Sequence, residues 1–293
     1  MTRFKGSITA LITPMRKGGI DETAFASLIE WQIGEGTHGV VPVGTTGESA
    51  TLRHEERERL IELAVEVAND RVAVIAGTGS NDTDEAVALT RFARKAGADG
   101  ALVIVPYYNK PTQEGLYRHF MAVAASAEMP IVLYNVPSRT VASIAVETLA
   151  RLAKDAPNII GIKDASADMT RIAEQRMALG AEFIQLSGDD SSALGFMAHG
   201  GHGCISVTAN IAPRLCADFQ DACLAGDFKR ALMLQDRLMP LHLALFAETS
   251  PAPVKYAASL LGHASTELRL PLVQPGEATR ANLRRAMKEA GLL

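Results

Sequence analysis

Short runs of apolar, β-branched residues recur along the first two-thirds of the chain, and each run ends in glycine, proline or polar residues. There are eight of them, beginning near residues 7, 39, 72, 101, 130, 159, 183 and 204. Segments with helical spacing lie between them, for example Glu55 to Ala68 and Asp84 to Ala96. The runs start about every 20 to 33 residues, which is the length of one strand plus one helix.

Eight such units without a break favour a closed (β/α)8 barrel over an open, doubly wound sheet. The nearly continuous hydrophobicity of the runs fits a parallel sheet that is covered on both faces. A nucleotide-binding fold is the competing α/β interpretation, but its signals are weak. "GTGSND" has Asp82 where a third glycine belongs, and "GTTGES" lacks the lysine of a phosphate-binding loop.

Roughly 80 residues follow the eighth run, with helical patterns at Asp227 to Phe246, Pro253 to Leu261 and Glu277 to Ala290. We interpret them as the last barrel helix followed by a helical extension that could serve in assembly. The predicted division is therefore a barrel over residues 1–225 and a C-terminal helical extension over residues 226–293.

Composition excludes several classes of protein. Of the 293 residues, 47% are hydrophobic and 21% charged, and the net charge is -4, so nothing indicates disorder or a polyanionic partner such as nucleic acid. Cys216 and Cys223 lie seven apart on an expected helix, about 10 Å in rise, which exceeds the reach of a disulfide. We find no signal peptide and no run of about 18 apolar residues, and we expect a reduced, cytoplasmic protein.

The reacting groups of such a barrel come from the C-terminal ends of its strands. Lys163 ends the sixth run, in "IIGIKDAS". Period-two alternation places Ile159, Gly161 and Lys163 on one face and Ile160 and Ile162 on the other. If the first face is the barrel interior, Gly161 leaves space beneath the lysine stem.

The position of Lys163 in the sequence leaves two interpretations open. A lysine withdrawn from water is in part a neutral amine, which can attack a carbonyl group and form a Schiff base. The alternative is an ion pair with a nearby carboxylate such as Asp164, because burying an unpaired ammonium group is costly.

Two further strand ends, those of the fifth and second runs, carry candidate groups. Tyr134 ends the fifth run and could relay a proton, or it could simply bond to backbone. Thr45 and Thr46 in "VGTTGES" could hold a small carboxylate through hydroxyl and amide groups, or cap a helix. Arg139 offers a planar fork that suits a second carboxylate.

His199 and His202, in "HGGH", lack a carboxylate pattern that would complete a metal site.

Seven motifs in order, taken together, resemble the dihydrodipicolinate synthase family of the lysine Schiff-base pyruvate aldolases, nearly end to end. They are "GTTGESATL", "AGTGSN", "PYYNKPTQEGLYRHF", "LYNVPSRT", "IIGIKDAS", "LSGDDSSAL" and "GGHGCISVTAN". The resemblance implies a lyase of the diaminopimelate route to lysine that condenses pyruvate with L-aspartate 4-semialdehyde. No cofactor is implied, because pyruvate forms a covalent imine on Lys163.

The resemblance also assigns roles to residues by matching motif. Tyr134, Thr45 and Tyr108 would form a proton relay, with Tyr108 supplied by a neighbouring subunit, which implies a homotetramer built as a dimer of dimers. Four residues would contact substrate or line the pocket: Thr46, Ile205, Gly188 and, for the carboxylate of the semialdehyde, Arg139.

Family members are often inhibited by L-lysine at a subunit interface. The matching positions are Ser49, Ala50, His54, Asn81, Glu85 and Tyr107. Arg57 stands where lysine-sensitive members carry histidine, and a fixed cation there would weaken binding of a cationic effector, so we expect reduced feedback inhibition.

Two other hypotheses remain. One is a related pyruvate aldolase acting on N-acetylneuraminate or a 2-keto-3-deoxy sugar acid, which would share Lys163 and Tyr134. In those enzymes the position of Arg139 generally carries no arginine, so "PSRT" favours the synthase. The other is a non-catalytic sensor of pyruvate or an amino acid, for which a proton relay would have no use.

Overall fold

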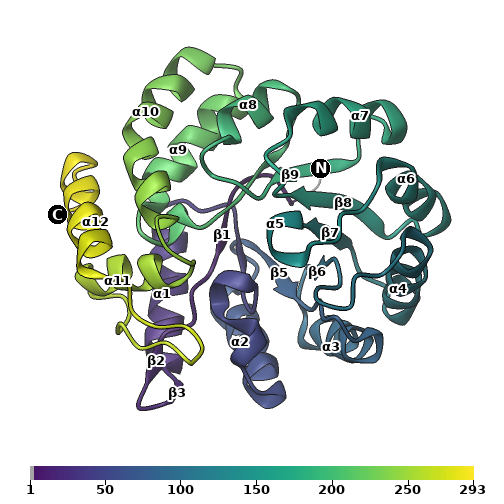
Figure 1. Ribbon diagram of the computed structural model, residues 1–293, viewed down its shortest axis with the longest axis horizontal. Helices are drawn as coiled ribbons and strands as arrows, with labels where there is room; N and C mark the ends of the chain where they lie inside the picture. The colour runs from purple at the N-terminus through teal and green to yellow at the C-terminus, as the bar shows by residue number, and fades with distance from the viewer. Residues whose placement is uncertain (1–2) are drawn as a thin grey trace.

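The computed structural model describes residues 3–293 and has a closed barrel at its centre. Eight parallel strands form the ring in the order β1-β10-β9-β8-β7-β6-β5-β4, and helices surround it (Figure 1). The predicted (β/α)8 fold with a helical C-terminal part is confirmed, and each of the eight apolar runs supplies one strand. The ring strands are β1 (Gly6–Ala10), β4 (Gly39–Val41), β5 (Ala73–Gly77), β6 (Gly100–Ile104), β7 (Ile131–Asn135), β8 (Ile159–Asp164), β9 (Ile184–Ser187) and β10 (Gly203–Ser206).

Each of the five predicted helical segments forms a helix, and five of the twelve α-helices within residues 3–293 begin at a side-chain cap. Asp21, Asp82, Thr112, Asp168 and Asp227 each accept a backbone N–H bond from the first turn of the helix that follows. The α-helices are α1 (Glu22–Gly34), α2 (His54–Ala68), α3 (Thr83–Ala96), α4 (Gln113–Ser126), α5 (Pro137–Thr140), α6 (Val146–Asp155), α7 (Met169–Leu179), α8 (Ala193–Ala198), α9 (Pro213–Leu224), α10 (Phe228–Leu245), α11 (Ala252–Leu260) and α12 (Glu277–Glu289).

Several short elements were not predicted. A two-stranded hairpin, β2 (Met15–Arg16) with β3 (Gly19–Ile20), follows β1, and 3-10 turns occur at η1 (Thr45–Gly47), η2 (Ser49–Thr51) and η3 (Thr208–Asn210). Elements of two or three residues are too short to display a hydrophobic period.

Buried side chains form two cores, as expected for a sheet covered on both faces. The larger core lies between the strands and the helices, and the smaller fills the barrel with residues such as Ile8, Ile75, Val132 and Leu186. Tyr134 belongs to the smaller core.

The predicted alternation along β8 is wrong at its first half. Ile159 and Ile162 both pack in the outer core, whereas Ile160 packs against the inner one. The register with β7 shifts between Ile131 and Val132, which indicates a β-bulge. One extra residue in a strand reverses the face of the sheet to which the residues on one side of it point. Downstream of the bulge, strict alternation resumes and Lys163 points inward.

The last barrel helix is also placed differently from the prediction. α9 packs on β1 and β10, whereas α10, which matches the pattern at Asp227 to Phe246, packs on α9. α12 in turn packs on α10 and α11, outside the ring (Figure 1). The predicted boundary at 225/226 falls in the turn between α9 and α10, and the division into two units stays a prediction.

Two bulk properties were also expected from the sequence. The three cysteines, Cys204, Cys216 and Cys223, are free and buried. Within residues 3–293, no helix combines the length and the apolar character that a membrane crossing requires.

Candidate active site

Lys163 lies near the C-terminal end of β8 with its side chain inside the barrel, and only 6% of the residue is exposed. It stands beside Tyr134 of β7 in the sheet register. Its Nζ lies 4.1 Å from the centroid of the Tyr134 ring, within range of a cation–π contact. Two of the residues predicted from strand ends are therefore neighbours.

Asp164 is not the partner of this lysine. Its carboxylate accepts hydrogen bonds from Arg171 Nε at 3.0 Å and Gln175 Nε2 at 2.9 Å, both on α7. Burial alone would raise the pKa of Asp164, but hydrogen bonds from Ser166 and the charge of Arg171 outweigh it and lower the pKa. Among residues 3–293, Lys163 forms no ion pair within 4.0 Å, so the ion-pair interpretation fails.

Space for the lysine comes from a different glycine than predicted. A Cβ on Gly161 would lie 2.6 Å from the carbonyl oxygen of Ile184 on β9, so Gly161 permits close strand packing. A Cβ on Gly188 would lie 3.0 Å from Cε of Lys163 and 2.6 Å from Cβ of Ala165. Gly188 therefore makes room for the lysine stem.

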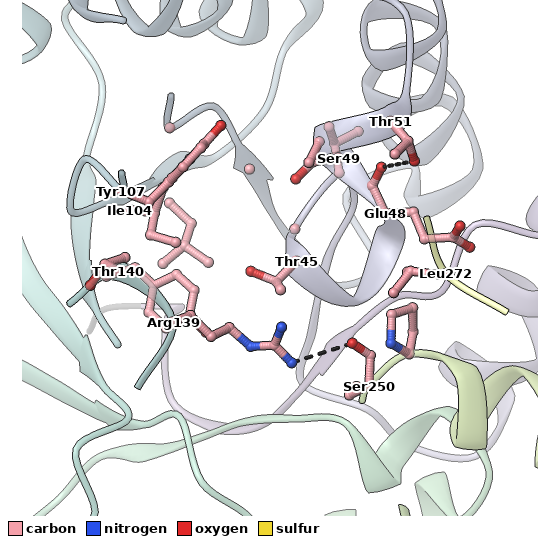
Figure 2. Close-up of a pocket in the computed structure, with 18 of the residues that line it drawn as sticks. Thr45, Glu48, Ser49, Thr51, Ile104, Tyr107, Arg139, Thr140, Ser250 and Leu272 are labelled. Atoms are coloured by element: carbon pink, nitrogen blue, oxygen red, sulfur yellow. Dashed lines mark hydrogen bonds between the residues drawn. The ribbon is translucent and has the colours of Figure 1, made fainter. Parts of the chain in front are cut away.

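A cavity of about 300 Å³ has Tyr134 in its wall. Thr45, Tyr107 and Arg139 line it from the loops after β4, β6 and β7, and Ser250 and Leu272 line it from the C-terminal part (Figure 2). Its size and its mixture of apolar walls and few polar groups suit small ligands.

Some predicted residues do not line this cavity. Lys163 contacts Tyr134 from beside it, and Gly188 contacts the lysine stem. Ile205 is part of the inner core and 1% exposed, and Thr46 is 6% exposed in the loop that carries Thr45. None of these four residues is part of the cavity lining.

The loop after β4 holds Thr45 and Thr46 in a tight 3-10 turn, η1. Val43 and Glu48 flank this turn with φ angles of 58° each, in the left-handed region that non-glycine residues rarely adopt. Thr13 Oγ1 donates to the carbonyl oxygen of Gly47 at 2.8 Å. Backbone conformations of this kind persist only where surrounding contacts hold them. In proteins they are found mainly at active and ligand-binding sites.

Arg139 lies on α5, the short helix after β7, with its side chain exposed toward the cavity (Figure 2). Its Nη2 donates to the carbonyl oxygen of Ser250 at 3.3 Å. That single bond leaves most of the guanidinium donors available to an anion in the cavity.

The two histidines of "HGGH" form hydrogen bonds with backbone groups. His199 Nδ1 bonds with the carbonyl oxygen of Gly195 at 2.7 Å, and His202 Nδ1 accepts from the backbone N–H of Gln185 at 3.1 Å. Over residues 3–293, no three His, Cys, Asp or Glu side chains gather in a way that could hold a metal ion.

Comparison with known proteins decides the family. The model of the dihydrodipicolinate synthetase family matches residues 3–290. The chain belongs to this family. A protein of Rhodospirillum centenum named 4-hydroxy-tetrahydrodipicolinate synthase is 60% identical over 290 residues, covering 99% of both chains.

Solved structures of the dihydrodipicolinate synthetase family have the same fold. The dihydrodipicolinate synthase of Aquifex aeolicus superposes with a TM-score of 0.97 at 48% identity, covering 99% of each chain. The enzyme of Acinetobacter baumannii, described as chloride inhibited and complexed with pyruvate, superposes with a TM-score of 0.96 at 46% identity, again over 99% of each chain.

Tyr108, which the resemblance to this family places in the proton relay, lies apart from the other candidates. It is 88% exposed, has a φ of 72°, and does not line the cavity, whereas its neighbour Tyr107 does. A protruding aromatic side chain on a strained backbone has a position suited to contact with another molecule.

Three of the six predicted effector positions line the same cavity. Ser49, Ala50 and Tyr107 line it together with Arg57. Arg57 Nη1 bonds to Oε1 of Glu85 at 2.6 Å, and Arg57 Nε donates to the carbonyl oxygen of Ser49 at 3.0 Å. The arginine thus neutralises the one carboxylate of the set. Two members make other bonds: His54 pairs with Glu58, and the Asn81 carbonyl oxygen accepts from Asn109.

Sequence reasoning missed the part of the wall that comes from the C-terminal residues, namely Thr249, Ser250, Pro251, Pro271 and Leu272. It also missed Glu48 and its partner Lys255. A lysine inside the apolar segment "PAPVKYAAS" is a signal of the same kind as the lysine in "IIGIKDAS".

Proposed function

We propose that this protein is a 4-hydroxy-tetrahydrodipicolinate synthase, which condenses pyruvate with L-aspartate 4-semialdehyde through an imine on Lys163. This is a step of the diaminopimelate route to lysine. The observation that carries the proposal is a buried lysine that has no ion-pair partner among residues 3–293 and packs on Tyr134, at the wall of a cavity that Arg139 also lines.

The reaction begins when the neutral amine of Lys163 attacks C2 of pyruvate, and loss of water then gives the imine. A proton leaves the pyruvate methyl group to give an enamine, which attacks the aldehyde carbon of the semialdehyde. The substrate's own amine then displaces Lys163 by transimination and closes the ring. No separate cofactor takes part.

Tyr134, Thr45 and Tyr108 are assigned to the proton transfers. The position of Tyr134 supports its role, because its ring contacts the amine and also forms part of the cavity wall. Thr46, Ile205 and Gly188 are assigned to the pyruvate pocket.

Arg139 is assigned to the carboxylate of the semialdehyde. Its exposed guanidinium on the cavity wall supports this role. A reaction of two acids requires two anion sites, and the loop at Thr45 and Thr46 provides the other.

Borohydride reduction in the presence of pyruvate tests the proposal. We expect an intact-mass increase that peptide mapping assigns to Lys163, and no increase in Lys163→Ala. Absence of the adduct on Lys163 would rule out an imine mechanism.

The second substrate is tested separately, by assay of the cyclic product formed from pyruvate and the semialdehyde. Cleavage of N-acetylneuraminate or 2-keto-3-deoxygluconate instead would contradict the proposal. In Arg139→Ala we expect the pyruvate adduct to form as in the wild type while use of the semialdehyde falls. An equal loss of both would refute the role of Arg139.

We also propose self-association into a homotetramer, a dimer of dimers in which Tyr108 completes the site of a neighbouring copy. The exposure of Tyr108 supports this. Ser49, Ala50, His54, Asn81, Glu85 and Tyr107 are the proposed lysine-effector site.

A further inference from the structure

Glu48 and Lys255 form an ion pair with no contact with water. Lys255 Nζ lies 2.7 Å from Oε1 of Glu48, and both side chains are 0% exposed. Glu48 is the last residue of the "GTTGE" turn, and Lys255 lies on α11 of the C-terminal part. The bond therefore joins positions 207 residues apart in the chain.

The second carboxylate oxygen of Glu48 is also held from the C-terminal part. Oε2 accepts the backbone N–H of Arg269 at 3.1 Å. The Arg269 side chain donates to the carbonyl oxygen of Thr51 at 2.9 Å and to both oxygens of Glu56 on α2. The segment from Glu48 to Glu56 is thus fastened at three points by two residues of the C-terminal part.

Stability alone is a poor reason for this arrangement. Removing two opposite charges from water costs about as much as their attraction returns, and a well-packed apolar pair usually stabilises a protein as well or better. What a buried ion pair offers beyond apolar packing is a fixed geometry, because a displaced partner leaves an unpaired charge.

The geometry that Glu48 fixes is that of the loop carrying Thr45 and Thr46. Glu48 has a φ of 58°, and its backbone N–H donates to the carbonyl oxygen of Thr45 at 3.1 Å. In Figure 2 the Glu48 carboxylate points away from Thr45, toward the segment that carries Leu272. The loop thus presents Thr45 to the cavity on one side and is anchored through Glu48 on the other.

We propose that the Glu48–Lys255 pair is a positioning device, by which the C-terminal part of the chain holds the Gly44–Thr51 loop in the conformation that receives pyruvate. Neither residue touches the reacting atoms. The inference rests on the proposed function for its catalytic readout, but the conformation of the loop can be measured independently.

Four variants test the role of the pair: Glu48→Gln, Lys255→Met, the double variant that combines them, and Glu48→Asp. Each single neutral variant leaves one buried charge without a partner, so we expect both to melt at lower temperature than the wild type. The double variant leaves no buried charge, and we expect its melting temperature to return toward that of the wild type.

We expect the trapping of pyruvate to rank the variants differently from their melting temperatures. In the double variant we expect the pyruvate concentration for half-maximal borohydride trapping to rise about tenfold or more, because a loop displaced by even 1 Å loses its fit to the ligand. Glu48→Asp keeps the charge but withdraws it from Lys255, so it should show the same rise in a folded protein.

Two measurements confirm that the variants are folded and that the loop has moved. Trp31, the single tryptophan, stacks on His263 at 3.8 Å, so its emission reports whether the segment after α11 stays docked on α1. Hydrogen exchange of the amides in residues 44–51 should be faster in the double variant and in Glu48→Asp than in the wild type. The control is Glu30→Gln with Arg71→Met, an exposed ion pair between α1 and the turn after α2, which should change neither trapping nor exchange.

A double variant or Glu48→Asp that is folded, with wild-type trapping and wild-type exchange at residues 44–51, would overturn the proposal. If the wild type itself gives no adduct on Lys163, the proposed function fails, and hydrogen exchange alone then decides the positioning role. Unchanged exchange in that case would also refute it.

Discussion

The surroundings of Lys163 depend on one residue of the neighbouring strand end. Gly188 follows β9, and the space that its missing side chain leaves is occupied by the stem of the lysine. A methyl group there would meet both Lys163 and Ala165 at less than ordinary contact distance. The direction of the amine is therefore set by packing, as well as by its contact with Tyr134.

We expect Gly188→Ala to slow imine formation about tenfold or more while the barrel still folds, since overpacking of this size costs about 1–3 kcal/mol. The rate of borohydride-trapped adduct and the melting temperature are the two measurements. Gly34→Ala on α1 is the control, because a Cβ there meets no atom within 4 Å. A Gly188→Ala variant with an unchanged trapping rate would show that the lysine has space to move.

Arg57 decides the charge of the proposed effector site. Its bond to Glu85 already neutralises the carboxylate that a cationic amino acid would use. We expect calorimetry at neutral pH to give weak L-lysine binding, and Arg57→His to strengthen it, because Glu85 is then released. Tight binding by the wild type would contradict this prediction.

Among the helices, α4 carries a buried histidine against the start of α3. His119 Nδ1 and the Thr83 hydroxyl lie 2.9 Å apart, and burial lowers the pKa of His119 to about 4, from its usual 6.5. Above pH 6.5 the histidine is neutral in both the folded and the unfolded chain. Between pH 6.5 and 4 only the unfolded chain takes up the proton, so stability is lost as the pH falls.

The loss attributable to His119 amounts to about 3 kcal/mol once the pH has reached the lowered pKa. Urea unfolding of the wild type and of His119→Gln, followed from pH 7 to pH 4.5, should show a smaller decline for the variant. His54→Gln, at an exposed histidine on α2, serves as the control and should decline like the wild type. Parallel curves for the wild type and His119→Gln would refute the assignment.

In the molecule as a whole, the barrel and the C-terminal part build the cavity together. The barrel supplies Tyr134, against which Lys163 packs, and Arg139, and the C-terminal part supplies the wall at Ser250 and Leu272. Tyr108 is the one proposed member of the relay that points outside this arrangement, with 88% of its surface exposed. We therefore expect a second copy of the chain to be needed to complete the proposed relay.

Mixing two inactive variants tests whether Tyr108 acts in a neighbouring copy. Lys163→Ala chains keep Tyr108, and Tyr108→Phe chains keep Lys163, so a mixed dimer contains one complete site. After refolding equal amounts together, we expect activity near one quarter of wild type, the fraction of complete sites under random pairing. Sedimentation velocity should show association of both variants, and no recovery on mixing would place Tyr108 in the site of its own chain.

The repeating units of the barrel could be predicted from the amino-acid sequence alone. Period-two and period-3.6 patterns depend on near neighbours in the chain, and so the starts of the eight strands and of helices such as α2 and α3 could be predicted within one residue, whereas several apolar runs continue past the ends of their strands. The residue at each strand end is readable for the same reason, and this local pattern is sufficient to identify Lys163 and Tyr134 as candidates, whereas Arg139 lies in the segment after the fifth strand.

What lies around those residues depends on the tertiary structure. The bulge in β8, the close contact of Gly188 with the lysine stem, and the bonds of Asp164 to α7 arise between elements whose spacing no local pattern records. The same holds for Glu48 and Lys255, which are 207 residues apart in the chain and in direct contact in the fold. The local hydrophobic period specifies which face of a helix or strand is buried. The partner of each buried charged side chain depends instead on how the whole chain folds.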